Sequence, residues 1–531
     1  MNKANIDESS LIFFEGLNLL RAGRAEDADI LFAKAIRLDP NNVNVINLLG
    51  IRSYQKQDYK NALAFLNRAN SLSPNSVETL SNLGLIYYAI REYENALDFF
   101  NAALKVKPDI PEIHNNLGNA YKSLHNSKEA KKSYLKAIAL RPHYSEALSN
   151  YATLLLEEGE VEQAIKLFKD SIQANPNFST AFNNLGNALT QIEQYQDAFS
   201  CFERAIQIRP NYLDAHLNYG HSLRKSKHYK LAIECLKRSL IINERSDEAH
   251  YALGETYYEN GEFDEARSHY RKCLDIAPKN LKARHALVVA QLPKVYQSCE
   301  EILSSRINFT KELEVLETLD NSSIPGDIVA TAISRHPFYI AYQAENNEPL
   351  LSRYGAICHK EAKTIQPEPK FCKPHPHDKI RIGIISNYFC DHPVWHAITK
   401  GMVLQIDKNK FDVYLFHTNG KSDDQTILAK SRAAQFVNCG KSVQDAANII
   451  NNSNIDVLIY PEIGMDTTAK ALACLRLAPL QIASWGHPET TGLPTIDFFV
   501  SGQLLEPQNA AKNYREELIC LPNLGTYVED F

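Results

Sequence analysis

Histidine and carboxylate side chains follow three β-rich runs in the last third of the chain, where each run gives way to a polar loop. The first loop is SNYFCDHPVWH, the second is PEIGMD and the third is WGHPETTGLPTID. These loops contain His392, His396, Glu462, Asp466 and His487. Imidazole and carboxyl groups exchange protons near neutral pH, so a cluster of them suits acid–base chemistry on a hydroxyl group.

Glycines occur in two of these loops, at Gly464, Gly486 and Gly492. A residue without a Cβ lets the backbone come close to a ligand. The alternative is structural, because His392 and His487 each precede a proline. A histidine in such a turn can be a turn residue that is hydrogen-bonded to backbone. The residues alone leave both interpretations open.

A parallel sheet would bring the three loops to one edge. The β-rich runs KIRIGIIS, FDVYLFHT, IDVLIYPE, LQIASWG and IDFFVSG lie within residues 379–531, and helical segments separate the earlier ones. Strands joined by helical crossovers form a parallel sheet that is covered on both faces, and ligands bind at the carboxyl ends of its strands. We therefore predict an α/β Rossmann-like lobe over residues 379–531.

The first half of the chain repeats with a period of 34 residues, and the string NNLGNA occurs twice at twice that spacing. One column is alanine in every repeat: Ala28, Ala62, Ala96, Ala130, Ala164, Ala198, Ala232 and Ala266. A second column, twelve residues earlier, is glycine in every repeat except at Ala152. A large residue follows each alanine by four positions, and proline follows it by twelve except at Glu244.

These columns resemble the tetratricopeptide repeat, and each has a physical reason. Small residues are needed where two antiparallel helices approach closely, and the large residue fills the space between them. Proline ends the second helix because it has no N–H group for the helical ladder. The pattern predicts an α-solenoid of eight repeats over residues 9–280, whose concave surface is suited to binding an extended peptide.

An asparagine recurs two residues before the small residue in five consecutive repeats: Asn82, Asn116, Asn150, Asn184 and Asn218. A side-chain amide has a donor and an acceptor, so a row of amides can hold the main chain of a peptide. The alternative is that these side chains are solvated or bond to the neighbouring repeat. We expect the extra asparagines, Asn115 and Asn183, to lie at the surface or to form inter-repeat bonds.

The remaining segments and the composition complete the domain plan. Residues 1–8 are expected to be a tail, and residues 281–378 to be capping helices followed by a linker. The linker contains His375 and His377, which we interpret as linker residues rather than metal ligands. A net charge of −6 and a pI of about 6.3 do not favour nucleic-acid or membrane binding. The ten cysteines form no CxxC pair, and no secretory signal is present, so we expect a cytoplasmic protein.

Together with these repeats, the motifs SNYFCDHP and APLQIASWGHPETTGLPTIDFF resemble the bacterial SPINDLY-like relatives of protein O-GlcNAc transferase. The resemblance implies a glycosyltransferase of two Rossmann-like lobes, the GT-B arrangement, of which this chain contains the N-terminal lobe. Such enzymes transfer GlcNAc from UDP-GlcNAc to Ser or Thr of a protein, with inversion at the anomeric carbon. No metal or other cofactor is implied.

The resemblance also implies roles for particular residues. It places His392 at the active-site histidine near the acceptor hydroxyl. The loop that shapes the sugar and acceptor site corresponds to residues 486–491. From the three loops we take His396, Glu462, Gly464, Gly486, His487, Pro488, Thr490 and Thr491 as site residues. The asparagine row corresponds to the ladder that holds the acceptor peptide.

Two departures from the family are visible. Gln435 stands before Phe436, on the helix that precedes the third strand, where many relatives carry histidine. The chain also stops at NLGTYVEDF, where the family continues into a second lobe with the UDP site. The expectation is therefore a truncated transferase with weak or no activity. Two alternatives are a peptide-binding scaffold without catalysis and a protein N-glucosyltransferase that modifies Asn.

Overall fold

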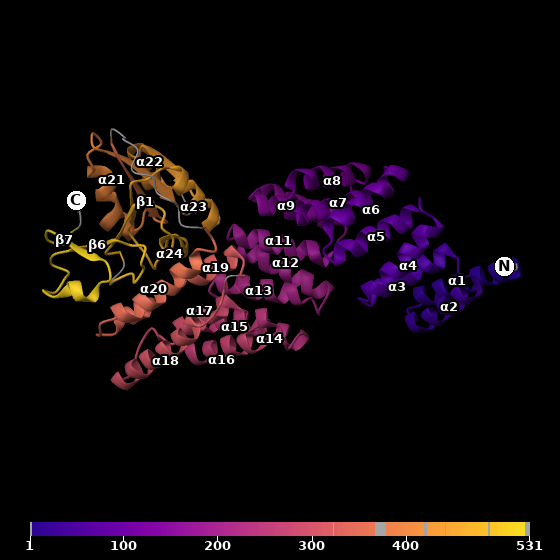
Figure 1. Ribbon diagram of the computed structural model, residues 1–531, viewed down its shortest axis with the longest axis horizontal. Helices are drawn as coiled ribbons and strands as arrows, with labels where there is room; N and C mark the ends of the chain where they lie inside the picture. Colours follow the sequence, from indigo (N-terminus) through magenta and orange to yellow (C-terminus); the bar gives the residue numbers. More distant parts are fainter. Residues whose placement is uncertain are drawn as a thin grey trace. The chain divides into compact units, whose positions relative to one another are not determined.

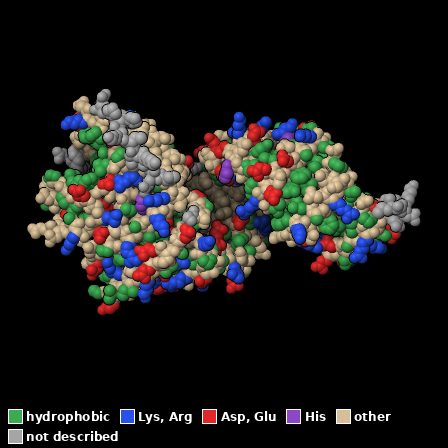
Figure 2. Space-filling model, viewed as in Figure 1, with side chains coloured by type: hydrophobic (Ala, Val, Ile, Leu, Met, Phe, Trp, Pro, Cys, Tyr) green, Lys and Arg blue, Asp and Glu red, His purple; other side chains and the backbone are tan. Residues whose placement is uncertain are grey.

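The computed structural model describes residues 3–321, 323–366, 379–418, 422–440, 442–486 and 489–525, with side chains from residue 8 onward. It divides into two units, Met1–His228 and Tyr229–Phe531. Within the described ranges, no helix is long and apolar enough to cross a membrane. On the face shown in Figure 2, basic and acidic side chains are intermingled, in keeping with the small net charge.

Sixteen helices follow one another from Lys3 to Ile276 and form the predicted repeats. In chain order they are α1(Lys3–Arg21), α2(Ala25–Leu38), α3(Val43–Gln55), α4(Tyr59–Leu72), α5(Val77–Ala89), α6(Tyr93–Val106), α7(Pro111–Ser123), α8(Ser127–Leu140), α9(Ser145–Glu158), α10(Val161–Ala174), α11(Ser179–Gln191), α12(Tyr195–Ile208), α13(Leu213–Lys225), α14(Tyr229–Ile242), α15(Asp247–Asn260) and α16(Phe263–Ile276). Helix α1 already includes part of the expected tail. The first unit contains α1–α13, and the second begins with α14.

The small and large columns of the repeat pack directly against each other. A Cβ added to Gly186 would lie 2.7 Å from the ring of Phe202, and one added to Gly50 would lie 2.7 Å from Leu66. The same contact occurs in four other hairpins: Gly16–Phe32, Gly84–Phe100, Gly118–Tyr134 and Gly254–Tyr270. The large side chains are completely buried. The predicted reason for the two columns is therefore confirmed in these hairpins.

Each pair of helices is joined by a turn whose central residue has a positive φ. These residues also recur every 34 positions: Gly23, Gln57, Arg91, His125, Gly159, Glu193, Lys227 and Gly261. Only three of them are glycine, so five repeats hold a residue with a side chain in the left-handed region. Because glycine marks few of these turns, this periodicity is hidden in the sequence. It gives independent support for eight repeats.

Five further helical segments connect the repeats to the α/β lobe: α17(Leu281–Val289), α18(Cys299–Glu317), α19(Gly326–Ile333), η1(Phe338–Tyr342) and α20(Glu348–Ala362). Their buried side chains belong to the same hydrophobic core as one face of the sheet. This shared core explains why the connector and the lobe form a single unit with the last repeat. The proposed linker residues His375 and His377 lie outside the described residues.

The lobe is built on a sheet of seven parallel strands (Figure 1). The strands are β1(Ile380–Ser386), β2(Phe411–His417), β3(Gln435–Asn438), β4(Val457–Tyr460), β5(Leu480–Ser484), β6(Phe498–Gly502) and β7(Glu517–Leu521). Their order in the sheet is β3-β2-β1-β4-β5-β6-β7. The Rossmann-like prediction is confirmed. The placement of Gln435 on a helix is wrong, because Gln435 begins β3.

Helices cover both faces of this sheet. The π-helical turn η2(Trp395–Thr399) with α21(Lys400–Gln405) and α22(Asp424–Arg432) encloses one apolar core. On the other face, α23(Val443–Asn452) and α24(Thr467–Ala473) pack into the core that the connector shares. The sheet order reverses direction between β1 and β4, and in sheets of this kind ligands bind at the carboxyl ends of the strands beside such a switch point.

Candidate active site

The loop after β1 carries two aromatic rings in contact. The imidazole of His392 stacks on the phenol of Tyr388, with ring centres 3.9 Å apart and ring planes 13° apart. Partial burial lowers the pKa of His392 below its usual value. The backbone N–H of Val394 donates to His392 Nδ1 at 3.2 Å. In the neutral ring the proton therefore lies on Nε2, which can donate to a ligand oxygen.

Both interpretations of His392 thus hold in part. It is a turn residue with a backbone hydrogen bond, and it also keeps one ring nitrogen for other partners. His396 differs, because its side chain is 43% exposed and its Nε2 lies 2.9 Å from the carboxylate of Asp391. We find His396 at the outer surface of the loop rather than among the buried groups of the strand ends.

Glu462 follows β4 and is completely buried. Its Oε1 accepts a hydrogen bond at 3.1 Å from the backbone N–H of Asn387, the first residue after β1. Burial raises the pKa of Glu462 to about 8, although hydrogen bonds from Ser386 and Asn387 oppose the shift. Glu462 is therefore mostly protonated at neutral pH and joins the two loops across the switch point.

Three buried polar atoms at this edge have no hydrogen-bond partner among the described residues. They are Asn387 Oδ1 after β1, Glu462 Oε2 after β4 and Ser484 Oγ at the end of β5. Buried polar atoms in folded proteins are nearly always hydrogen-bonded. Unpartnered atoms from three neighbouring strands therefore indicate that this edge is built to receive polar groups of a ligand.

The glycines of the strand-end loops approach other parts of the protein. A Cβ on Gly486 would overlap the carbonyl oxygen of Pro461, so the loops after β4 and β5 touch through their backbones. Gly464 has a φ of +101°, and a Cβ there would lie 2.8 Å from the ring of His336. The sequence explained these glycines by approach to a ligand, whereas their nearest neighbours in the structure are protein groups.

The threonines of the third loop are anchored by the residue that precedes the edge strand β7. Thr490 and Thr491 are buried, and both hydroxyl groups donate to the carboxylate of Glu516, which precedes β7. The backbone N–H of Thr491 adds a bond of 2.9 Å to the same carboxylate. These threonines therefore hold the loop in shape. His487 and Pro488, also predicted for the site, lie outside the described residues.

Several residues near the site were not foreseen. Glu516 and Tyr388 have no pattern that marks them, and His336 lies in HPFYIAYQ, which reads as an aromatic core segment. Glu489 lies inside the predicted loop 486–491 but is not among the predicted site residues. Its Oε2 accepts from Asn347 Nδ2 at 2.9 Å, and burial raises its pKa to about 7.

The asparagine row makes bonds between repeats. Asn150 Nδ2 donates to Asn115 Oδ1 at 2.9 Å, and Asn218 Nδ2 donates to Asn183 Oδ1 at 3.0 Å. Asn184 Nδ2 lies 3.4 Å from the hydroxyl of Thr153 in the preceding repeat. Asn115 and Asn183 are almost completely buried, which agrees with inter-repeat bonding and not with a surface position.

The first two members of the row differ from the other three. The side chains of Asn82 and Asn116 are half-buried and have no hydrogen-bond partner within the described part of the first unit. Both amides therefore keep a donor and an acceptor for a ligand. The peptide-binding role of the row stays a prediction.

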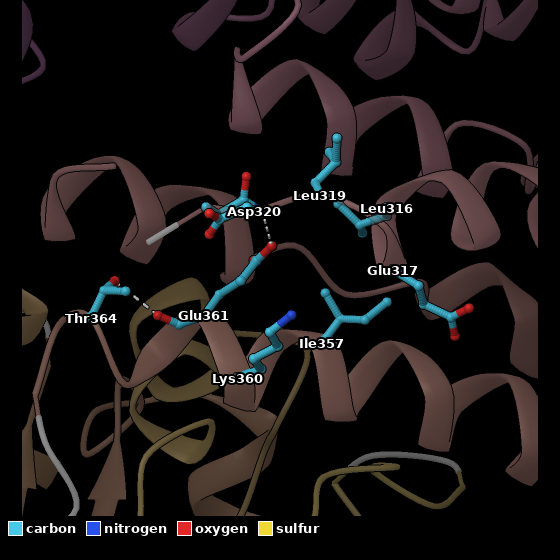
Figure 3. A pocket seen from close by; sticks show the side chains of 9 residues that line it. Leu316, Glu317, Leu319, Asp320, Ile357, Lys360, Glu361 and Thr364 are labelled. Carbon is cyan, nitrogen blue, oxygen red and sulfur yellow. Dashed lines mark hydrogen bonds between the residues drawn. The ribbon is translucent and has the colours of Figure 1, made fainter. Parts of the chain in front are cut away.

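A separate pocket of about 120 Å³ lies between the end of α18 and α20 (Figure 3). Its polar wall is the carboxylate of Glu361, which already binds His285 Nε2 at 2.8 Å and Asn321 Nδ2 at 2.7 Å. The pocket has no residue in common with the strand-end loops, so we do not assign the site to it. Among the described residues, no three His, Cys, Asp or Glu side chains are grouped as metal ligands would be.

Residues 332–530 match the profile described as Glycosyl transferase family 41. Tetratricopeptide repeat profiles match residues 15–77, 77–110 and 152–212. The profiles of YpiA-like C-terminal tetratricopeptide repeats and of anaphase-promoting complex subunit 3 match residues 111–177 and 191–273.

Similar curated proteins come from plants. The probable UDP-N-acetylglucosamine–peptide N-acetylglucosaminyltransferase SEC of Arabidopsis thaliana is 27% identical over 245 residues, which cover 45% of this chain and 23% of that protein. The probable UDP-N-acetylglucosamine–peptide N-acetylglucosaminyltransferase SPINDLY of the same plant is 28% identical over 155 residues, which cover 28% of this chain and 17% of that protein. The matched part therefore spans less than a quarter of either relative.

A solved structure, a mutant of the Thermobaculum terrenum O-GlcNAc transferase, aligns with a TM-score of 0.47 at 18% identity. The alignment covers 66% of this chain and 59% of that chain.

Proposed function

Because residues 332–530 form a glycosyltransferase family 41 domain next to tetratricopeptide repeats, we propose that this chain is a protein O-glycosyltransferase of the O-GlcNAc transferase type. The donor is UDP-GlcNAc, and the acceptor is a Ser or Thr hydroxyl of a protein. The lobe described above is the acceptor-side lobe of a GT-B enzyme. The reaction inverts the anomeric carbon without a resident metal, in the cytoplasm.

The observation that carries this proposal is the group of polar atoms at the carboxyl ends of β1, β4 and β5. It combines Nε2 of His392 with buried atoms of Asn387, Glu462 and Ser484, none of which has a hydrogen-bond partner among the described residues. A ligand rich in hydroxyl and amide groups, such as an N-acetylated sugar beside a peptide, would satisfy such atoms. An apolar ligand would leave them unpaired, which is costly in a buried site.

In the reaction, the acceptor oxygen attacks the anomeric carbon while the bond to the diphosphate breaks. Because Nδ1 of His392 accepts from Val394, Nε2 carries the proton and can hold the acceptor oxygen by donating to it. His392 in this tautomer orients the hydroxyl, and another group takes its proton. Because burial raises its pKa to about 8, Glu462 is mostly neutral near pH 7.

The repeats supply the protein substrate in this proposal. The amides of Asn82 and Asn116, which have no hydrogen-bond partner in the described part of the chain, can pair with the main chain of an extended peptide irrespective of its side chains. Binding through the main chain favours a broad range of substrates over one sequence. The lobe then selects hydroxyl-bearing residues.

The test is sugar transfer by the full chain. Radiolabelled UDP-GlcNAc and an array of Ser- and Thr-containing peptides should give labelled peptides, with the label mapped to hydroxyl residues by mass spectrometry. His392→Ala should reduce labelling about a hundredfold, since a lost positioning bond in a transition state costs roughly that much. The matched control His396→Ala, in the same loop but at its surface, should retain labelling.

Other outcomes would contradict the proposal. Peptide binding without labelling or UDP-GlcNAc binding would favour a scaffold. Label on Asn instead of Ser or Thr would favour an N-glycosyltransferase. Equal loss in the His392 and His396 variants would remove the assigned role of His392.

A further inference from the structure

The last repeat holds Arg335 of the connector through two polar side chains, and a third supports one of them. Glu255 on α15 forms an ion pair with the Arg335 guanidinium, and both side chains are less than a fifth exposed, at 14% and 17%. The hydroxyl of Tyr251, also on α15, lies 3.1 Å from the guanidinium. Tyr270 on α16 donates to the Glu255 carboxylate at 2.6 Å. A charge held by so many groups has little freedom to move.

The backbone of Arg335 is fixed as well. Its carbonyl oxygen accepts a hydrogen bond of 3.1 Å from the hydroxyl of Tyr354 on α20. That hydroxyl also lies 2.9 Å from Nδ1 of His285 on α17, and both residues are completely buried. Arg335 is therefore anchored at its side chain by the last repeat and at its main chain by the connector.

The next residue, His336, contacts the active-site edge. Its ring lies against Gly464, where a Cβ would come within 2.8 Å of the ring carbon Cδ2. Gly464 also has a φ of +101°, so residue 464 is constrained to glycine by its backbone and by its neighbour. Gly464 lies two residues after Glu462, in the loop 461–466 that follows β4.

We propose that Glu255 is a positioning residue for the loop 461–466, acting through Arg335 and His336. The inference rests on the proposed function, because that function gives the loop its role. The contacts themselves do not depend on it. The connection joins the last repeat to the loop after β4. The last repeat then supports the active-site edge as well as ending the repeat array.

Hydrogen exchange measured by mass spectrometry on the full chain tests this connection. Glu255→Gln keeps an acceptor for Tyr270 but removes the charge that holds Arg335. It should speed exchange in peptides spanning 461–470 by about tenfold, because the loop loses one of its supports. The matched control is Glu317→Gln, which breaks the ion pair with Arg353 on the same connector and should leave these peptides unchanged.

A milder variant distinguishes the loss of this contact from misfolding of Glu255→Gln. Tyr251→Phe removes one hydrogen bond to Arg335 and should give the same pattern with a smaller change. If either variant loosens α15 and α16 while exchange at 461–470 stays at the wild-type rate, the connection does not exist. Where transfer activity is measurable, Glu255→Gln should lower kcat more than it raises KM for peptide. Absence of all transfer would overturn the proposed function but leave the exchange result standing.

Discussion

The imidazole of His392 lies nearly parallel to the phenol ring of Tyr388, 3.9 Å away between ring centres. One face of the imidazole is thus shielded, while the backbone N–H of Val394 occupies Nδ1. The two contacts favour the neutral ring and fix its tautomer. The stacking partner, and not only the histidine, therefore sets the chemistry available at this position.

Replacement of Tyr388 should change the titration of His392. In Tyr388→Ala the imidazole gains solvent, so its lowered pKa should rise towards the usual value of about 6.5. Tyr388→Phe keeps the stack and should leave the pKa unchanged. NMR titration of the His392 Cε1–H signal measures both variants. An unchanged pKa in Tyr388→Ala would show that the stack does not cause the shift.

Removal of the Glu462 carboxyl should make stability less sensitive to pH between about 4.5 and 8. The folded pKa of about 8 lies above the unfolded value of about 4.5, so the unfolded chain releases this proton first as pH rises. Wild-type stability therefore falls between pH 4.5 and 8. Glu462→Gln cannot ionise and keeps an acceptor for Asn387. At pH 7 we expect a gain of about 3 kcal/mol in the free energy of unfolding.

Urea unfolding of Glu462→Gln and wild type at several pH values makes this measurement. The difference between the two proteins should be small near pH 4.5 and should grow with pH. Parallel stability curves for the two proteins would mean that Glu462 is not held neutral.

The histidine pair of the last repeat should make that repeat sensitive to acid. His250 Nδ1 lies 3.0 Å from His269 Nδ1, a hydrogen bond that needs one donor and one acceptor. Burial and the nearby His250, Lys272 and Lys237 lower the pKa of His269 to about 4, below the usual 6.5. The unfolded chain takes up protons first as pH falls, so stability is lost from about pH 6.5 down to about pH 4.

His269→Gln should remove part of this acid sensitivity, because glutamine can hydrogen-bond without titrating. Melting temperatures between pH 7 and pH 4 provide the measurement, and His396→Gln, at an exposed position, is the control. A fall in melting temperature that is equally steep in wild type and in His269→Gln would contradict the prediction.

The asparagine row should separate into residues for stability and residues for binding. Asn183 is almost completely buried, accepts from Asn218 and donates to Asn184. Asn183→Ala should therefore cost about 1–3 kcal/mol of stability, since it leaves buried partners unpaired. Asn82→Ala and Asn116→Ala should leave the melting temperature nearly unchanged and weaken peptide binding. Calorimetry with an extended peptide measures the affinity of each variant. If Asn82→Ala and Asn116→Ala bind the peptide as tightly as the wild type does, the row has no role in binding.

The fold was predictable because its signals are local or periodic. The contact between Gly186 and Phe202 recurs in other hairpins, so a period of 34 residues displays it. The short strand β3 and the mostly exposed strand β7 gave no such signal. The hairpin turns were missed for a different reason, since residues such as Arg91 and Glu193 take a positive φ without the glycine that would mark it.

The active site was only partly predictable, because its support comes from distant residues. Loop positions at strand ends, such as His392 and Glu462, follow from the order of strands and helices. The contacts of Glu516 with Thr490 and of His336 with Gly464 join separate segments, and no single segment indicates them. Burial decides the rest, since the sequence alone does not reveal that the carboxyl group of Glu462 is completely buried.

The anchoring of Thr490 and Thr491 by Glu516 has a consequence for the order of events during synthesis. Each repeat contains all the residues of its own hairpin, so a nascent chain can close it soon after the second helix has been made. The loop 489–492 has no such independence, because its two hydroxyl groups and one N–H group bind a carboxylate 25 residues further on. We expect the repeat array to exist on the ribosome before this loop takes its final shape, so the strand-end loops mature last.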